Sequence, residues 1–287
     1  MIDNMDMFAD LESFVMFIGY PRSGHTLIGS LLDAHPHIMV SNEYDVLKQI
    51  SNYHGDNLPQ YILSGIYENC KQHQGQRIQS GYDYTVPNQY QAGYKDYISV
   101  IGDKKGGKTT KRFVENYDVA YGLLTNFKKQ INKPIKCLHV TRNPFDNISS
   151  MTLRKHCKLM DLTYSTTYFA KMAPIKVDDN LLERMIDKYF SFVKKNEQLS
   201  GLDIWQSYQL FTEDLIESPA LELSKLCNFL RVFADSDYLE DCASIVMKKV
   251  KKTRLIIDWP AEYVERVQIN IEKYQILNKY RSSQPFL

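Results

Sequence analysis

The stretch FVMFIGYPRSGHTLIGSLLDAHP, residues 14–36, decides the expected fold of this chain. It starts with a continuous apolar run that ends at Gly19, as is typical of a buried parallel strand. Its second half places apolar residues at helical spacing until Pro36 stops the pattern. Between the two, residues 19–26 read G-x-x-x-x-G-H-T, which is the spacing of a phosphate-binding loop. The stretch therefore predicts a strand, an anion-binding turn and a helix.

Strand-like and helix-like segments alternate along the rest of the chain. The runs IKCLHV (135–140) and IWQSYQLF (204–211) are expected to be strands. Helical patterns follow them, and Asn143 with Pro144 suits the start of one helix. Residues 44–103 show weak periodicity and are expected to form loops and short helices. The alternation predicts an α/β fold with a central parallel sheet flanked by helices.

The composition is that of an ordinary soluble protein. The formal net charge of +1 gives no global reason to expect nucleic acid as a partner. The five cysteines form no C-x-x-C pair, which argues against a disulfide framework and a zinc site. The acidic first residues lack the pattern of a secretory signal, and no apolar run approaches the roughly 20 residues that span a bilayer. We therefore expect a cytoplasmic protein that binds neither membrane nor nucleic acid.

The phosphate-binding loop differs from that of a nucleoside triphosphatase in its fixed charges. His25 stands where the loop lysine would be, and a free histidine is only about a quarter protonated at pH 7. Arg22 is always charged and can take over the role of that lysine. The next strand ends at Arg142, where the aspartate that holds Mg²⁺ in such enzymes is expected. These residues predict a nucleotide with an additional phosphate, bound by arginines without a metal.

Three segments in this order resemble the sulfotransferases that use 3′-phosphoadenosine 5′-phosphosulfate (PAPS). YPRSGHT resembles their 5′-phosphosulfate loop, TRNPFDNISS their 3′-phosphate element, and FTEDLIESPALELSKLCNFL a strand, acidic pair and helix of that family. The resemblance implies a sulfotransferase architecture related to the P-loop enzymes. The residues that it places around the 5′-phosphosulfate are Arg22, Ser23, Gly24, His25 and Thr26. It places Arg142 and Ser150 at the 3′-phosphate, and Arg154, four residues after Ser150, lies on the same helical face as that serine.

A further similarity concerns the catalytic base. In the tyrosylprotein branch of the family, a helix ending LDAHP is followed by an acidic base, and Glu43 falls at the matching offset. Small-molecule members instead carry a catalytic His after a Lys-Thr pair, and the similar GDKKGGKTT lacks that His. The resemblance thus implies Glu43 as the base, Lys104 or Lys105 as an electrostatic helper, and Arg22 at the transferring group.

The chain departs from the family near its C-terminus. The Arg-Lys-Gly signature is absent, and the Tyr that commonly precedes the acidic pair is Thr212. The run KKVKKTRLIIDW offers Lys251, Lys252 and Arg254 as substitutes at the 3′-phosphate. The same run can equally be a solvated face, so both readings stay open.

The resemblance implies sulfuryl transfer from PAPS, without a metal, to a hydroxyl or amine of an acceptor. We expect a small-molecule acceptor and a single domain over residues 1–287, whose insertion at 44–103 forms part of the acceptor site. A homodimer is left open. Two alternatives also remain: a P-loop kinase-like enzyme, and an inactive module that binds adenosine 3′,5′-bisphosphate.

Overall fold

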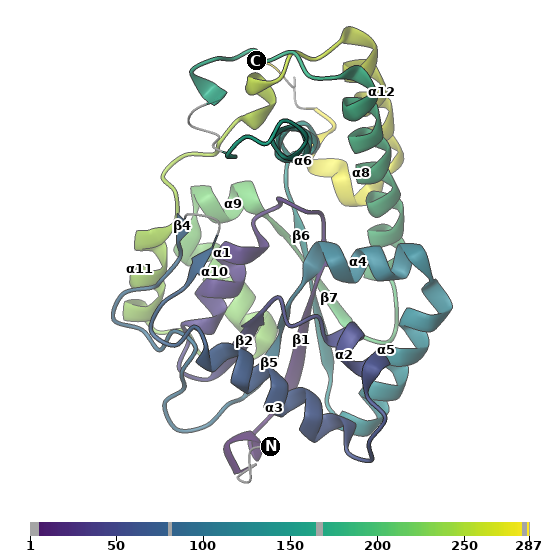
Figure 1. Ribbon diagram of the computed structural model, residues 1–287. Helices are drawn as coiled ribbons and strands as arrows, with labels where there is room; N and C mark the ends of the chain where they lie inside the picture. The colour runs from purple at the N-terminus through teal and green to yellow at the C-terminus, as the bar shows by residue number, and fades with distance from the viewer. Residues whose placement is uncertain (1–5, 80–81, 165–168, 283–285, 287) are drawn as a thin grey trace.

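A five-stranded parallel sheet forms the centre of the molecule (Figure 1). The computed structural model describes residues 6–79, 82–164, 169–282 and 286. In spatial order the strands of the sheet are β2 (Ile38–Asn42), β5 (Val100–Lys104), β1 (Ser13–Gly19), β6 (Ile135–Thr141) and β7 (Gln206–Phe211).

The middle strand, β1, is buried along its whole length because it lies between β5 and β6. Its continuous apolar sequence fits a strand with helices on both faces. After β1 the chain moves to one side of the sheet, and it later crosses to β6 on the other side. In parallel sheets, ligands bind at the carboxyl ends of the strands where the chain changes direction in this way. The loop after β1 lies at that point.

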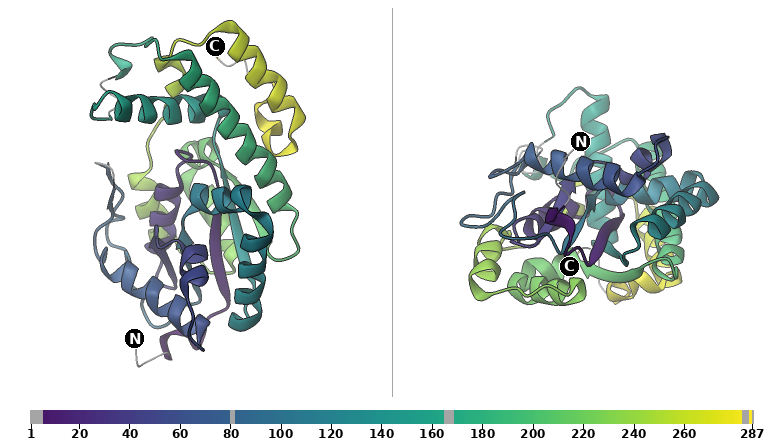
Figure 2. Two further views of the ribbon diagram at one scale, coloured as in Figure 1. Left: turned by 45° about the vertical axis from the view of Figure 1, so that its right-hand side comes forward. Right: turned by 90° about the horizontal axis from the view of Figure 1, so that it is seen from below.

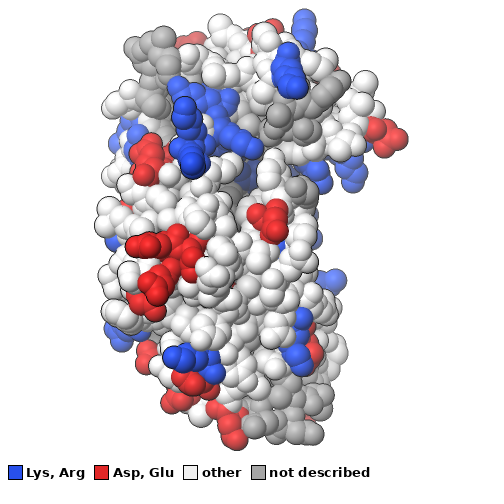
Figure 3. Space-filling view, turned by 90° about the vertical axis from the view of Figure 1, so that its left-hand side faces the viewer, with Lys and Arg blue, Asp and Glu red and all other residues white. Residues whose placement is uncertain are grey.

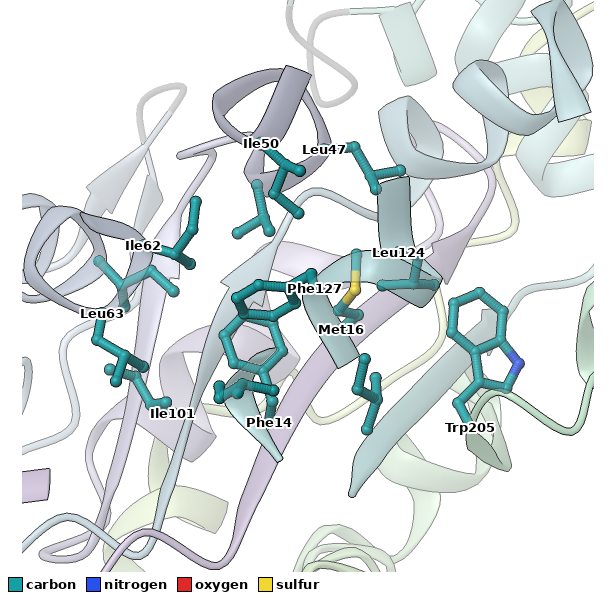
Figure 4. Close-up of a cluster of buried hydrophobic side chains, with 14 of the residues drawn as sticks. Phe14, Met16, Leu47, Ile50, Ile62, Leu63, Ile101, Leu124, Phe127 and Trp205 are labelled. Carbon is teal, nitrogen blue, oxygen red and sulfur yellow. The ribbon is translucent and has the colours of Figure 1, made fainter. Parts of the chain in front are cut away.

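Two groups of helices cover the faces of the sheet. One face packs against α2 (Val46–Asn52), α3 (Leu58–Lys71), α4 (Gly106–Glu115) and α5 (Tyr117–Ile131). The other packs against α1 (His25–Asp33), α9 (Thr212–Glu217), α10 (Pro219–Leu230) and α11 (Ser236–Ile245). Figure 4 shows the first of these cores, where the rings of Phe14 and Phe127 meet edge to face with centroids 5.0 Å apart.

A third cluster of helices lies beyond the carboxyl ends of the strands (Figure 2). It contains α6 (Pro144–Leu159), α8 (Asp179–Ser200), the 3₁₀ turn η2 (Thr253–Ile256), α12 (Ala261–Lys273) and the 3₁₀ turn η3 (Gln275–Tyr280). Helix α6 begins as expected, because the Asn143 side chain accepts hydrogen bonds from the backbone N–H groups of Phe145 and Asp146, and Pro144 occupies the first turn. This cluster therefore faces the loops that follow the strands of the sheet.

The structure confirms the α/β fold, the strand and helix at residues 13–33, and the strands at 135–141 and 206–211. The expectation of loops and short helices for residues 44–103 is wrong at two places. Helix α3 has 14 residues, and β5, which begins at Val100, is an inner strand of the sheet. The remaining described elements of this stretch are α2 and the short hairpin of β3 (Ile78–Gln79) and β4 (Tyr82–Asp83).

Candidate functional site

The turn between β1 and α1 has the backbone of an anion-binding loop. Gly24 precedes α1 with φ 91°, and no side chain caps the helix. Because the first N–H groups of a helix have no partner within it, this end can bind an anion. Gly19 has φ 145°, and a Cβ there would lie 2.6 Å from the carbonyl oxygen of Val140, so a side chain does not fit. Both glycines of the motif are therefore required by geometry.

A cavity of about 570 Å³ opens directly above this loop. It lies at the carboxyl ends of the strands, between the sheet and the third helix cluster. Its lining includes these residues of the sequence-based prediction: Arg22, Gly24, His25, Thr26, Glu43, Arg142 and Ser150. The two predicted groups, around the loop and around Arg142, therefore meet in one cavity.

His25 points inward, so the structure gives it a different place from that of a loop lysine. Its Nε2 lies 3.2 Å from the carbonyl oxygen of Ile18, and its Nδ1 lies 3.3 Å from Oγ of Ser23. Burial lowers the pKa of His25 to about 4, and the ring is neutral at pH 7. The ring packs against Gly106, where a Cβ would lie 2.2 Å from Nε2. His25 thus supports the loop from below.

Glu43 and Lys104 meet beside the loop threonine. Nζ of Lys104 donates to Oε1 of Glu43 at 2.7 Å and lies 3.4 Å from Oγ1 of Thr26. Nζ of Lys105 donates to Oε2 of Glu43 at 2.5 Å. Lys104 is buried, whereas 43% of the Glu43 side chain is exposed, at the wall of the cavity. The arrangement holds a carboxylate with one accessible side next to the loop.

The two lysines keep Glu43 ionised. Burial raises the pKa of Glu43, but the charges and hydrogen bonds of Lys104 and Lys105 outweigh this effect and place the pKa below its ordinary value. Burial also lowers the pKa of Lys104, an effect that Glu43 opposes. Glu43 has φ 69°, a left-handed conformation that is uncommon outside glycine. Such backbone conformations cluster at functional sites.

Arg22 and Ser150 lie side by side in the lining of the cavity. Nε of Arg22 donates to Oγ of Ser150 at 3.4 Å. The hydroxyl of Tyr164 lies 3.1 Å from the same Oγ, and the guanidinium groups of Arg22 and Arg154 lie 5.1 and 5.4 Å from the centre of the Tyr164 ring. Ser150 and Tyr164 line the cavity, whereas Arg154 contacts the Tyr164 ring and is not part of the lining.

Arg142 connects the loop to the segment before η2. Its Nη1 donates to the carbonyl oxygen of Arg22 at 3.3 Å, and its Nη2 donates to the carbonyl oxygen of Lys251 and to Oγ1 of Thr253. Lys251 and Thr253 line the cavity. Lys252 lies outside the lining. The C-terminal basic run therefore reaches the site mainly through Lys251.

Arg254 is engaged in an ion pair away from the cavity. Its Nη1 donates to Oδ2 of Asp146 at 2.7 Å, and its backbone N–H donates to Oδ1 of the same side chain. Asp146 is buried, so this pair fixes η2 against α6. Arg254 thus acts on the site by positioning its neighbours.

One strand beside β1 does end in a carboxylate residue, contrary to the expectation from the sequence. A cation, Arg142, does follow β6 directly, but β5, the other neighbour of β1, ends in Asp103 and Lys104. The Asp103 carboxylate accepts hydrogen bonds from Oγ of Ser41 and from the backbone N–H groups of residues 44–46. Burial raises its pKa to about 6. Asp103 thus shapes the turn that carries Glu43.

The sequence reasoning also missed two residues that hold the site together. Thr212 donates from Oγ1 to the carbonyl oxygen of Ser23 at 2.6 Å, and so braces the loop from the third motif. Tyr164 lies in a stretch without a recognisable pattern, and only the structure brings it to Ser150. The departure from the family at Thr212 was the one available signal.

Among residues 6–79, 82–164, 169–282 and 286, no group of three or more His, Cys, Asp and Glu side chains is arranged to hold a metal ion. Within the same residues, no helix has both the length and the apolar character needed to cross a bilayer.

Solved structures share the arrangement of these elements. No family model and no curated protein sequence matches the chain. The sulfotransferase domain of the Synechococcus PCC 7002 olefin synthase aligns with a TM-score of 0.50 and 14% identity, over 96% of this chain and 97% of that domain. Mouse sulfotransferase SULT7A1, solved in complex with adenosine 3′,5′-bisphosphate (PAP), aligns with a TM-score of 0.46 and 13% identity, over 96% of this chain and 85% of that one. The first similarity covers nearly all of both chains, and the protein has the sulfotransferase fold.

Proposed function

We propose that this protein transfers a sulfuryl group from PAPS to a hydroxyl or amine of a small-molecule acceptor. One observation carries the proposal: the lining of a single cavity includes one group of residues, Thr26 and Glu43, which the buried Lys104 joins, and a second group, Arg142 and Ser150. The first group suits a reacting centre, and the second suits a phosphate some distance away. A donor that carries both a phosphosulfate and a separate phosphate matches this pair of sites.

The residues present fit such a donor. The uncapped start of α1, with Arg22 beside it, offers N–H groups and a fixed charge to the 5′-phosphosulfate. Arg142, Ser150 and Lys251 offer donors to the 3′-phosphate. The volume of about 570 Å³ lies within the usual range of ligand cavities, roughly 300–1,000 Å³.

In the proposed reaction, the donor supplies the sulfuryl group and its 5′-phosphate leaves. A bond forms between the acceptor oxygen and sulfur while the bond between sulfur and the bridging oxygen breaks, and the electron pair stays on that oxygen. Glu43 takes the proton of the acceptor hydroxyl, which its ionised state allows. Arg22, Lys104 and the N–H groups of the loop stabilise the negative charge on the leaving oxygen.

The test combines donor binding with transfer. We expect adenosine 3′,5′-bisphosphate to raise the melting temperature and to bind in titration calorimetry, and sulfate from labelled PAPS to appear on an acceptor in a panel of alcohols, phenols and amines. Arg142→Ala should weaken bisphosphate binding at least about tenfold, because it removes a charged contact. The exposed Lys129→Gln, on the far part of α5, serves as the matched control.

Three results would contradict the proposal in different ways. Absence of bisphosphate binding would remove the donor. Binding without transfer to any acceptor would favour an inactive module. Turnover of ATP that requires Mg²⁺ would favour the kinase-like alternative.

A further inference from the structure

The cavity lining contains more cationic side chains than the proposed donor contacts use. Among the residues that the structure describes, seven cationic and three acidic side chains line it. The cations are Arg22, Lys105, Lys108, Lys111, Arg142, Lys188 and Lys251, and the acids are Glu43, Asp83 and Glu213. The proposed donor contacts use Arg22, Arg142 and Lys251, and Lys105 is paired with Glu43. Three lysines therefore have no assigned function.

These three, Lys108, Lys111 and Lys188, form what we call the lysine rim. Lys108 and Lys111 follow Lys105 at intervals of three residues on α4, so they lie along the same side of that helix. Lys105, the residue before α4, donates to Glu43, so this side of the helix starts next to the proposed base. Lys188 comes from α8, which packs against α4. The lysine rim thus extends from Glu43 toward solvent.

The lysine rim lacks matching acids. Lys111 pairs with Glu115, but both side chains are about half exposed, so this pair contributes little. Within the described part of the chain, neither Lys108 nor Lys188 has an acidic oxygen within 4.0 Å. Nζ of Lys188 instead lies 5.9 Å from the centre of the Phe192 ring, another lining residue. The rim combines an aromatic surface with unneutralised charge.

The like charges also act on one another. Burial lowers the pKa of Lys188, and the positive charges of Lys111 and Lys155 lower it further. Cations gathered without acids repel one another, and a bound anion would remove that cost. On the face shown in Figure 3, Lys and Arg side chains gather beside a hollow in the upper half of the molecule, while acidic side chains gather lower down.

We propose that the acceptor carries an anionic group, a phosphate or a carboxylate, which the lysine rim binds while the acceptor hydroxyl reaches Glu43. This inference rests on the proposed function, because it places the acceptor on the Glu43 side of a bound donor. The donor's own phosphates lie at the loop and at Arg142, on residues from other elements. The anion that the lysine rim binds is therefore separate from the phosphates of the donor.

Matched acceptors test the inference directly. Transfer from labelled PAPS is measured for tyrosol against 4-hydroxyphenylacetate, and for glycerol against glycerol 3-phosphate. We expect kcat/KM to favour the anionic member of at least one pair by about tenfold or more, through KM. The pair that responds distinguishes a carboxylate from a phosphate as the recognised group.

Variants of the rim should reduce this preference. We expect Lys188→Gln to reduce it about threefold and Lys108→Gln with Lys188→Gln about tenfold, the range for partly exposed charge contacts. Lys188→Arg should restore the preference, and Lys129→Gln should not change it. The affinity for adenosine 3′,5′-bisphosphate should stay within about twofold in all of them.

The outcomes separate this inference from the function on which it rests. If the protein transfers sulfate but uses neutral and anionic acceptors equally, or if the double variant keeps the preference, the rim does not bind the acceptor. A loss of bisphosphate affinity in the double variant would assign the lysines to the donor and overturn the inference. If transfer is absent, binding of 4-hydroxyphenylacetate and glycerol 3-phosphate to wild type and to the double variant is measured by calorimetry. Binding that the double variant loses supports the inference about the rim, and absence of binding to wild type rejects it.

Discussion

Glu43 combines three properties that a catalytic carboxylate needs. Two lysines hold it ionised, one side of it faces the cavity, and a turn fixed by Asp103 carries it in a left-handed backbone conformation. A carboxylate used only for stability would not need its exposed side or its strained backbone. The buried Lys104 joins it to Thr26, so the proposed base and the loop are connected through one ammonium group.

We expect Glu43→Gln to lower kcat by about 10²–10⁴-fold, which is the usual contribution of a general base. Glutamine keeps the size of the side chain and can still accept from a lysine, so adenosine 3′,5′-bisphosphate should bind within about twofold of wild type. Steady-state transfer and calorimetry measure the two quantities. Glu68→Gln, an exposed acid on α3, is the matched control. A rate close to wild type in Glu43→Gln would show that another group takes the proton.

His139 predicts how the stability of the fold depends on pH. It is fully buried in β6, and burial lowers its pKa to about 3, whereas a histidine in the unfolded chain titrates near 6.5. Only the unfolded chain gains this proton, so protonation favours unfolding. The folded state therefore loses stability progressively as the pH falls from about 6.5 toward 3. Between pH 7.5 and pH 5 the loss is about 2 kcal/mol. Asp103, whose pKa is raised, acts in the opposite sense.

The comparison of variants isolates His139 from Asp103. Urea unfolding of wild type and His139→Gln at pH 7.5 and pH 5 should show that the variant loses about 2 kcal/mol less on acidification. The Asp103 effect is common to both proteins and cancels. His54→Gln, at an exposed position, should follow wild type. Parallel pH profiles for His139→Gln and wild type would mean that His139 does not titrate in this way.

At the scale of elements, the sequence predicted those parts of the site that short local patterns determine. The strand, loop and helix at residues 13–33 and the Asn143–Pro144 helix start were predictable because apolar runs and caps act within a few residues. Strand β5 was not, because its end, Gly102 to Lys104, is polar. Its Asp103 is satisfied by backbone groups of residues 44–46, a contact across almost 60 positions that no local pattern reports.

The same limit applies to contacts between elements of the site. Glu43, Arg142 and Ser150 were found through motifs, and the structure brings them to one cavity. Tyr164 and the lysine rim depend on how α4, α6 and α8 pack, which periodicity does not determine. The inward position of His25 likewise depends on Gly106 of α4, 81 positions away in the chain.

Gly106 at the start of α4 and Gly122 in α5 provide a matched pair of glycine variants. A Cβ at Gly106 would lie 2.2 Å from Nε2 of His25, whose ring is held on both nitrogens, so Gly106→Ala should lower stability by about 1–3 kcal/mol and weaken bisphosphate binding. At Gly122 of α5 a Cβ meets nothing within 4 Å, so Gly122→Ala should raise stability by about 1 kcal/mol. Urea unfolding and calorimetry measure both. Equal behaviour of the two variants would show that His25 moves aside freely.

At the scale of the whole molecule, the cavity joins two bodies of packed side chains. The sheet with its helices supplies the loop and Glu43, while the third cluster supplies Ser150 and, through η2, Thr253. Arg142 at the end of β6 bridges them, because its guanidinium reaches both the loop carbonyl of Arg22 and Thr253. A ligand that contacts both ends of the cavity would therefore tie the third cluster to the sheet.

Ligand binding should consequently protect regions far apart in the sequence. At about 100 times its dissociation constant, adenosine 3′,5′-bisphosphate should add about 2.7 kcal/mol to the free energy of unfolding. Hydrogen exchange should slow at residues 20–27 and also at 142–151 and 250–254, since the donor sites on these segments are joined through Arg142. In Arg142→Ala, any remaining protection at saturating ligand should be confined to residues 20–27. Wild-type protection confined to the loop would mean that the nucleotide does not reach the third cluster.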